Sequence, residues 1–144
     1  MQVVLKRAYD NASASDGTRV LVERLWPRGL SRKRATLDAW LREVAPSPQL
    51  RRWFHARPAQ WLTFRKRYLA ELARPEASRE LEQLYALAAT SIKLTLVFAS
   101  RDQRHNSAAV LKQLLEGMRK PPSTTGPKGA FARAVRARAA RRRP

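Results

Sequence analysis

Hydrophobic and polar positions change their spacing along this chain, and the changes mark its elements. Residues 3–9 and 18–25 alternate with a period of two, which is typical of β-strands. Residues 92–99 are apolar on both faces beyond Lys93, as expected of a central strand covered from both sides. Pro27 and Gly29 end the second stretch, because proline lacks a ladder donor and glycine permits a turn. The pattern predicts three strands.

Between the second and third strands the apolar spacing becomes helical. Four helices are predicted here, and they begin near Leu37, Pro48, Pro58 and either Pro75 or Ser78. The first rests on an apolar stripe at i, i+3, i+4 and i+7, formed by Leu37, Trp40, Leu41 and Val44. Ser47 is a good N-cap for the second. After the third strand, Asn106 or Ser107 caps a last helix that ends near Gly117.

These elements predict an α/β fold with a small, mainly parallel, three-stranded sheet covered by about five helices. We expect residues 1–120 to form a single α/β domain. The 10–17 connection is shorter than the dozen residues that a parallel crossover usually needs, so the direction of the first strand stays open. Residues 121–144 have a linker-like start and an Ala/Arg-rich end, which predict a flexible, disordered basic tail.

The chain is strongly basic, with a formal net charge of +19. The tail contributes seven of the 30 Lys and Arg residues and no acid, so the rest of the chain is basic as well. One interpretation is attraction of phosphates, nucleic acid or anionic small molecules. The other is a solvated basic surface that reflects a GC-rich coding bias toward Arg and Ala.

Several classes of function are excluded by composition. The chain has no cysteine, which removes disulfides and thiolate chemistry and suits a reducing cytoplasm. The apolar start is too short for a signal peptide, and no apolar run approaches the ~20 residues that span a bilayer. His55 and His105 are the two histidines, and they have no carboxylate cluster near them in the sequence. We therefore expect a cytoplasmic protein with no metal, no cofactor and no membrane partner.

Two strand-to-helix junctions carry the candidate chemistry. If their strands are parallel, both junctions lie at the carboxyl ends of the strands, where open α/β sheets bind ligands. Arg24, Arg28 and Arg101 could then bind an anion beside the N-terminus of the last helix. Asp102 and His105 are the candidate catalytic residues, because a histidine titrates near neutrality and an aspartate can orient it.

Each of these residues also has a structural interpretation. Asp102 could only start a turn, His105 could be an exposed loop residue, and Arg28 could pair with an acid. Trp26 lies at a strand end, where it could form a pocket wall or stack on a flat ligand, although core packing is its first interpretation.

At these junctions the sequence resembles a known family. The run from Asp16 to Leu30, which contains Arg-Leu-Trp-Pro-Arg-Gly, is similar to the signature of the YeaO-like branch of domain-of-unknown-function family 488. Further similar segments are Leu37 to Leu41, Ala45 to Ser47, Leu50 to Phe54, Phe64 through Tyr68 to Leu72, and Ala99 to Asp102 with His105 and Asn106. The resemblance covers residues 2–118 approximately, and the tail lies outside it.

The resemblance implies a compact α/β fold and a parallel first pair of strands. In the wider family an acidic residue, Val, Arg and then Pro-Arg-Ser follow a strand, and Glu23, Arg24, Pro27 and Arg28 occupy similar places here. A Cys-His-Arg element follows its late strand. Here the corresponding element keeps His105 but has no thiol, so the resemblance supports the site and leaves its chemistry open.

The sequence leaves three alternative hypotheses for the function. The first is an enzyme, or former enzyme, that acts on an anionic small molecule or nucleotide. The second is a nucleic-acid-associated protein that uses its basic face and tail. The third is a non-catalytic interaction module. A concave cluster of charge favours the first and a flat basic stripe favours the second, while the oligomeric state does not follow from the sequence.

Overall fold

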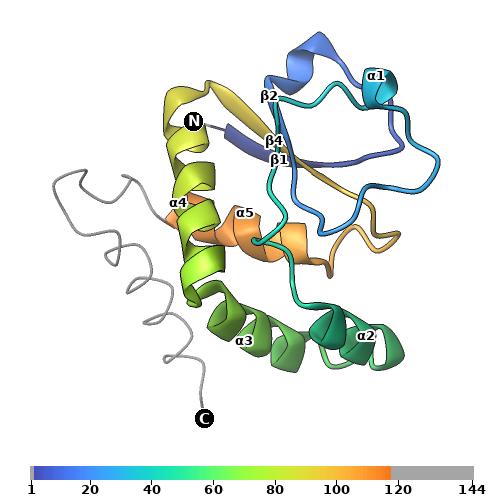
Figure 1. Ribbon diagram of the computed structural model, residues 1–144, viewed down its shortest axis with the longest axis vertical. Coiled ribbons are helices and arrows are strands. Elements are labelled where there is room, and N and C mark those ends of the chain that lie inside the picture. Colours follow the sequence, from blue (N-terminus) through green and yellow to red (C-terminus); the bar gives the residue numbers. More distant parts are fainter. Residues whose placement is uncertain (1, 118–144) are drawn as a thin grey trace, which may run out of the picture.

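The structure is a computed structural model that describes residues 2–117 (Figure 1). Its sheet has four parallel strands in the order β1-β4-β2-β3, whereas the sequence predicts three. The strands are β1 (Gln2–Arg7), β2 (Thr18–Leu21), β3 (Ala39–Trp40) and β4 (Lys93–Phe98). The α/β class and the parallel sheet are confirmed, and the number of strands is corrected.

The additional strand, β3, lies where the sequence pattern predicts the first helix. That helix is wrong because its four apolar residues do not share one face. Leu37 and Trp40 pack on one side of the sheet. Leu41 and Val44 pack on the other side. The short strand is fixed by pairing with β2, and the Leu41 N–H donates to the Leu21 carbonyl at 2.9 Å.

The central strand β4 decides the direction of β1. Both β1 and β2 pair in parallel with β4, which lies between them, so Leu96 has Leu5 on one side and Val20 on the other. The short connection after β1 therefore joins parallel strands that are not neighbours. It contains the 3-10 helix η1 (Ala14–Asp16) and turns at Gly17, where φ is 67° and a Cβ would lie 2.4 Å from the Lys93 carbonyl oxygen.

Five helices complete the described part of the chain. They are α1 (Arg32–Ala35), α2 (Pro48–Ala56), α3 (Trp61–Leu72), α4 (Pro75–Thr90) and α5 (Ser107–Gly117). The helices predicted near Pro48, at Pro75 and after Asn106 are confirmed, whereas the one predicted from Pro58 begins at Trp61. The single-turn helix α1 is not predicted by the sequence pattern.

The predicted capping residues explain two of these helix starts. The Ser47 hydroxyl accepts a hydrogen bond from the Leu50 N–H at 3.1 Å. The Asn106 side-chain oxygen accepts one from the Ala109 N–H at 2.9 Å. Each cap satisfies a backbone donor that the helix itself leaves unpaired.

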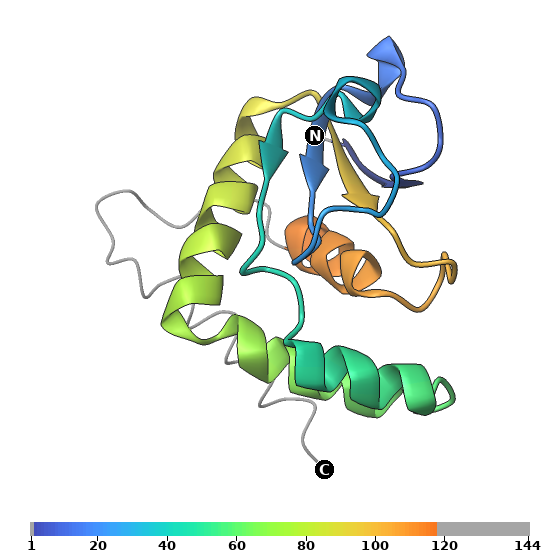
Figure 2. The same ribbon diagram turned by 45° about the vertical axis from the view of Figure 1, so that its right-hand side comes forward.

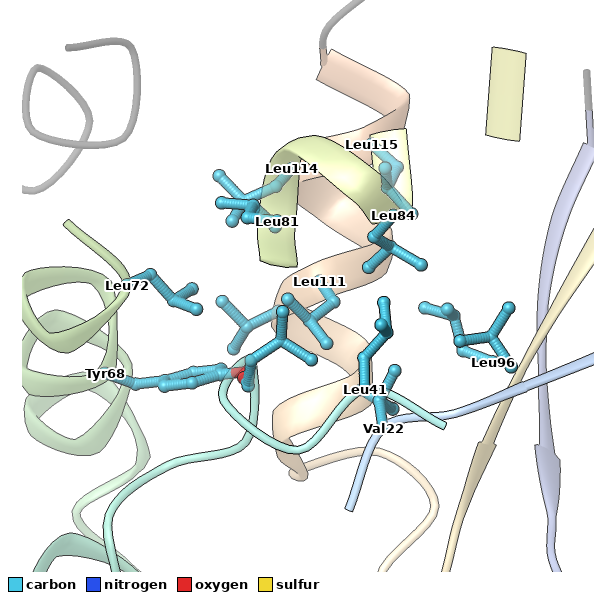
Figure 3. Packing of buried hydrophobic residues seen from close by; sticks show 14 of the residues in the cluster. Val22, Leu41, Tyr68, Leu72, Leu81, Leu84, Leu96, Leu111, Leu114 and Leu115 are labelled. Atoms are coloured by element: carbon cyan, nitrogen blue, oxygen red, sulfur yellow. The ribbon is translucent and has the colours of Figure 1, made fainter. Parts of the chain in front are cut away.

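The core has two hydrophobic clusters, one on each face of the sheet. In the larger cluster, α3, α4 and α5 pack against Leu94, Leu96 and Phe98 of β4, and Figure 3 shows leucines of α4 and α5 around Leu96. The smaller cluster contains Leu21 and Val97 and is covered by residues of the segment between β2 and β3. Helices therefore cover one face, and a mostly irregular segment covers the other.

Two sequence expectations concern membranes and the tail. Within residues 2–117, no helix is long and apolar enough to cross a bilayer. The predicted basic tail at 121–144 lies outside the described residues.

Candidate functional site

Strands β2 and β4 are parallel neighbours, so the segments that follow them leave the sheet at the same edge. We call this the carboxyl edge, and it comprises segments 22–31 and 99–106. The pairing continues one residue past β2, because the Val22 N–H donates to the Val97 carbonyl at 3.1 Å. Figure 2 shows both strands pointing toward the side of the molecule where α5 and α2 lie. The structure thus brings the two predicted loops to one edge.

The guanidinium of Arg24, a predicted anion-binding residue, binds backbone groups of the protein. Its guanidinium donates to the carbonyls of Ala45, at 3.0 Å, and Pro46, at 3.3 Å. It also lies 3.5 Å from the Glu43 carboxylate. Arg24 therefore connects segment 42–47, which we call the 42–47 turn, to the residues that follow β2.

The 42–47 turn is held by side chains from α3 and α4 as well. The Glu80 carboxylate accepts from the N–H groups of Glu43, at 2.6 Å, and Val44, at 3.2 Å. The Glu71 carboxylate accepts from the Ser47 N–H at 2.8 Å and from its hydroxyl at 2.6 Å. The Tyr68 hydroxyl, fully buried, donates to the Val44 carbonyl. The backbone N–H and carbonyl groups of this irregular turn are thereby hydrogen-bonded to charged and polar side chains instead of to a neighbouring strand.

Trp26, the predicted pocket wall, packs in the smaller core cluster. Its indole N–H donates to the Leu30 carbonyl at 2.6 Å, and its ring meets Trp40 edge-on at 5.4 Å. The Arg32 guanidinium lies over the same ring at 5.0 Å. These contacts fix the course of segment 22–31 and support the packing interpretation.

Arg28 stands apart from its neighbours in this segment. Its backbone carbonyl accepts from the Tyr9 hydroxyl at 3.0 Å, and Gly29 turns the chain next to it with φ of 77°. The Arg28 side chain itself is exposed and forms no hydrogen bond or ion pair with residues 2–117. The turn therefore presents this guanidinium to solvent.

Asp102 organises the loop in which it lies. Its carboxylate accepts from the N–H groups of Arg104 and His105, both at 2.9 Å, and these bonds lower the pKa of Asp102, that of His105 having the larger effect. The Asn106 side chain returns a hydrogen bond to the Asp102 carbonyl at 2.8 Å. In the described part of the chain, no hydrogen bond joins the Asp102 carboxylate to the His105 ring.

The His105 ring stacks on Trp61 instead. The ring centroids are 4.8 Å apart and the planes differ by 23°. This contact ties segment 99–106 to the first turn of α3. Arg101 and Arg104, on the same segment, have exposed side chains without an ion pair among the described residues. Of the six predicted site residues, Arg24 and Asp102 bind backbone groups, His105 stacks on Trp61 and Trp26 packs in the smaller core cluster. The side chains of Arg28 and Arg101 have no hydrogen bond or ion pair among residues 2–117.

Glu23 lies at the carboxyl edge and matches the acidic position of the family pattern, but it is not among the predicted site residues. Its side chain is 9% exposed, and one carboxylate oxygen is buried without a hydrogen-bond partner. Burial raises the pKa of Glu23, although the Arg51 charge and the Ala99 N–H oppose the rise. An acid directly after the apolar residues of β2 is the signal that could have identified it.

Metal-ligating side chains are dispersed in the described region. Residues 2–117 contain no group of three or more His, Asp or Glu side chains placed to hold a metal ion. The side chains of the carboxyl edge include guanidinium groups, the stacked imidazole of His105, the loop-forming carboxylate of Asp102 and the buried carboxyl of Glu23.

Comparison with known proteins gives a family but no activity. A family model described as "Inactive DUF488-N3 subclade" matches residues 2–126. "Uncharacterized protein YeaO" of Escherichia coli is 42% identical over 118 residues, which cover 82% of this chain and 100% of that protein. "Uncharacterized protein Rv3073c" of Mycobacterium tuberculosis is 39% identical over 116 residues, covering 81% of this chain and 95% of the relative. No solved structure matches.

Proposed function

Because the chain belongs to the DUF488 family, in its YeaO-like branch and within the subclade described as inactive, we propose that it binds a phosphate-bearing small molecule at the carboxyl edge without catalysing a reaction. The observation that carries this proposal is the presence of Arg28, Arg101 and Arg104 around one sheet edge with no carboxylate partner in the described chain. In this proposal Arg28 and Arg101 have the anion-binding role that is predicted for them from the sequence.

The charge of the edge favours an anion. Guanidinium groups make paired, charge-assisted hydrogen bonds with phosphate oxygens. The carboxyl edge contains four arginines, Arg24, Arg28, Arg101 and Arg104, and two acids, and the Arg24–Glu43 pair uses one of the arginines. Within residues 2–117 the other three arginines have no ion pair, so a phosphate would supply their counter-charge.

The contacts of Asp102 and His105 favour binding over catalysis. Asp102 accepts two backbone hydrogen bonds, and the resulting low pKa keeps its carboxyl ionised, which suits a turn-forming residue better than a general acid. His105 stacks on Trp61, and the chain has no cysteine to act as a nucleophile. In this proposal both residues shape the loop that presents Arg101 and Arg104.

Titration with inorganic phosphate, followed by calorimetry or NMR, tests the proposal. We expect Arg28→Ala and Arg101→Ala each to weaken phosphate binding about tenfold, the scale of one lost charge-assisted hydrogen bond. Arg79→Ala is the matched control, because Arg79 is exposed on α4 and distant in sequence from both loops. Equal weakening by all three substitutions would reduce the interaction to diffuse charge and defeat the proposal.

A second candidate, nucleic-acid binding, is favoured by a charge asymmetry between helices. Residues 48–72, which contain α2 and α3, hold six Lys and Arg residues, of which Arg65 is buried, and the single acid Glu71, whereas α4 holds three Glu and one Arg. Arg57 and Arg67 lie over the Trp53 ring at 5.4 and 4.3 Å. A surface pocket beside Trp53 is lined by Arg67 and Arg74 together with Glu71. The positive charge is thus extended, as a phosphate backbone requires.

The salt dependence of oligonucleotide binding distinguishes this candidate from the first. If the α2–α3 region binds single-stranded nucleic acid, Arg52→Ala with Arg67→Ala should reduce the slope of log K against log salt by about 1.4, or ~0.7 for each lost phosphate contact. Arg79→Ala should leave the slope unchanged. An unchanged slope in the double variant would assign oligonucleotide binding to another part of the chain.

A further inference from the structure

Glu23 has the least satisfied buried carboxylate at the carboxyl edge. The residue is 7% exposed, and its Oε2 atom has no hydrogen-bond partner within the described chain. A buried acceptor without a donor costs about 1–3 kcal/mol, so this arrangement lowers stability. Its position at the carboxyl edge, where open α/β sheets generally bind ligands, suggests a use for the free oxygen.

Other acids of the chain show what a purely structural carboxylate does. Asp16 accepts from Lys6, Arg19 and the Ser13 N–H, which together outweigh burial and lower the pKa of Asp16. Glu71 and Glu80 each accept two hydrogen bonds from the 42–47 turn. Glu82, on α4, also has one buried oxygen without a partner among residues 2–117, but that residue is only part-buried.

Two donor groups lie near the Glu23 carboxylate, the Arg51 guanidinium and the Ala99 N–H. The Arg51 guanidinium lies 4.0 Å from Glu23 Oε2, which is too far for a hydrogen bond, and 51% of the Arg51 side chain is exposed. A ligand that reaches Glu23 Oε2 would therefore displace the exposed Arg51 side chain or contact it. Ala99, whose N–H stabilises the Glu23 carboxylate, begins the segment that presents Arg101.

We infer that Glu23 accepts a hydrogen bond from a hydroxyl group of the ligand, and that the ligand is therefore a hydroxyl-bearing phosphate ester, such as a sugar phosphate or nucleotide. The inference rests on the proposed function, in which arginines of the same edge bind the phosphate. An acid at the end of a parallel strand binds a sugar hydroxyl in other open α/β sheets, and the paired Arg51 could hold the phosphate beside it.

The test compares two ligands that differ only in hydroxyl groups, glycerol 3-phosphate and n-propyl phosphate, on the full chain. We expect glycerol 3-phosphate to bind about tenfold more tightly, since a hydrogen bond to a charged group has that scale. Glu23→Gln should reduce this ratio to below about threefold while n-propyl phosphate binding persists. Glu76→Gln, at an exposed position on α4, should leave the ratio at its original value.

An NMR measurement on the unmodified chain keeps the inference independent of any variant. The Ala99 amide resonance should shift with glycerol 3-phosphate more than with n-propyl phosphate, because the Ala99 N–H stabilises the Glu23 carboxylate. Binding of both ligands with one affinity and no Ala99 difference would overturn the inference while preserving the proposed anion site. If glycerol 3-phosphate, n-propyl phosphate and inorganic phosphate all fail to bind, the proposed function itself is overturned.

Discussion

The 42–47 turn and segment 99–106 both carry residues of the family signature, yet they differ in where their charges are directed. Arg24, Glu71 and Glu80 lie outside the turn and each bind its backbone groups, so these three charges stabilise the fold. In segment 99–106, the Asp102 carboxylate shapes the loop and the guanidinium of Arg101 faces solvent. Similar residue types therefore stabilise one region and remain available for binding in the other.

This difference separates stability from binding among arginines of one short sequence run. Arg24 and Arg28 are four residues apart, but within residues 2–117 only Arg24 donates side-chain hydrogen bonds to the protein. A substitution at Arg24 should therefore act on folding, and one at Arg28 on ligand affinity. The following predictions test that separation.

Arg24→Ala should have the largest effect, a loss of about 2–3 kcal/mol in the free energy of unfolding. It leaves the Ala45 and Pro46 carbonyls without their charged donor, and hydrogen bonds to charged groups contribute about 1.5–3 kcal/mol. Urea unfolding of the variant and the parent chain measures the loss. A stability equal to that of Arg28→Ala would show that the turn does not depend on this arginine.

Tyr68→Phe should cost about 1–2 kcal/mol, since it removes only the hydroxyl that donates to the Val44 carbonyl and keeps the packed ring. The same urea experiment measures it. Because Tyr68 and Arg24 act on the same turn, we expect the double variant to lose less than the two single losses added. Strict additivity would mean that the two side chains stabilise separate structures.

Glu23→Gln should raise the free energy of unfolding by about 1 kcal/mol at neutral pH, because it removes a buried charge that lacks a full set of donors. Burial raises the pKa of Glu23 in the folded state, so the parent chain loses stability as the pH rises from the ordinary value of 4.5 through the folded-state value. Glu23→Gln has no carboxyl at this position, so its stability does not fall in this way.

The gain from Glu23→Gln should therefore vanish near pH 3.5, where the parent carboxyl is protonated in both states. Unfolding curves at pH 3.5 and pH 7 check this dependence, with Glu76→Gln as an exposed control that should show no such change. A variant that is less stable than the parent at pH 7 would mean that the charged form of Glu23 supports the fold.

Arg28→Ala should have the smallest effect on folding, below about 0.5 kcal/mol, because its exposed side chain has no partner in residues 2–117. Thermal unfolding with and without inorganic phosphate separates the two roles. The parent chain should gain thermal stability from phosphate and the variant should gain less. An equal gain in both chains would place the anion elsewhere.

The sequence by itself determined the elements whose patterns are long or have clear punctuation. Strand β4 follows from its mostly apolar sequence beyond Lys93, and α2 and α5 follow from Ser47, Pro48 and Asn106, because caps and strand periodicity are local properties of the chain. The family resemblance likewise follows from local residue runs. Pairing of β1 and β2 with β4 was beyond local information, since it joins residues separated by more than 70 positions.

Only the tertiary structure decided β3 and the roles of the charged residues. The spacing of Leu37, Trp40, Leu41 and Val44 imitates a helical stripe, and the true division of these residues between two faces depends on where β2 lies. The carbonyls that bind Arg24 come from 21 and 22 residues away. A sequence states which charges a chain carries, but hydrogen-bond partners brought together by folding determine which of those charges remain free to bind a ligand.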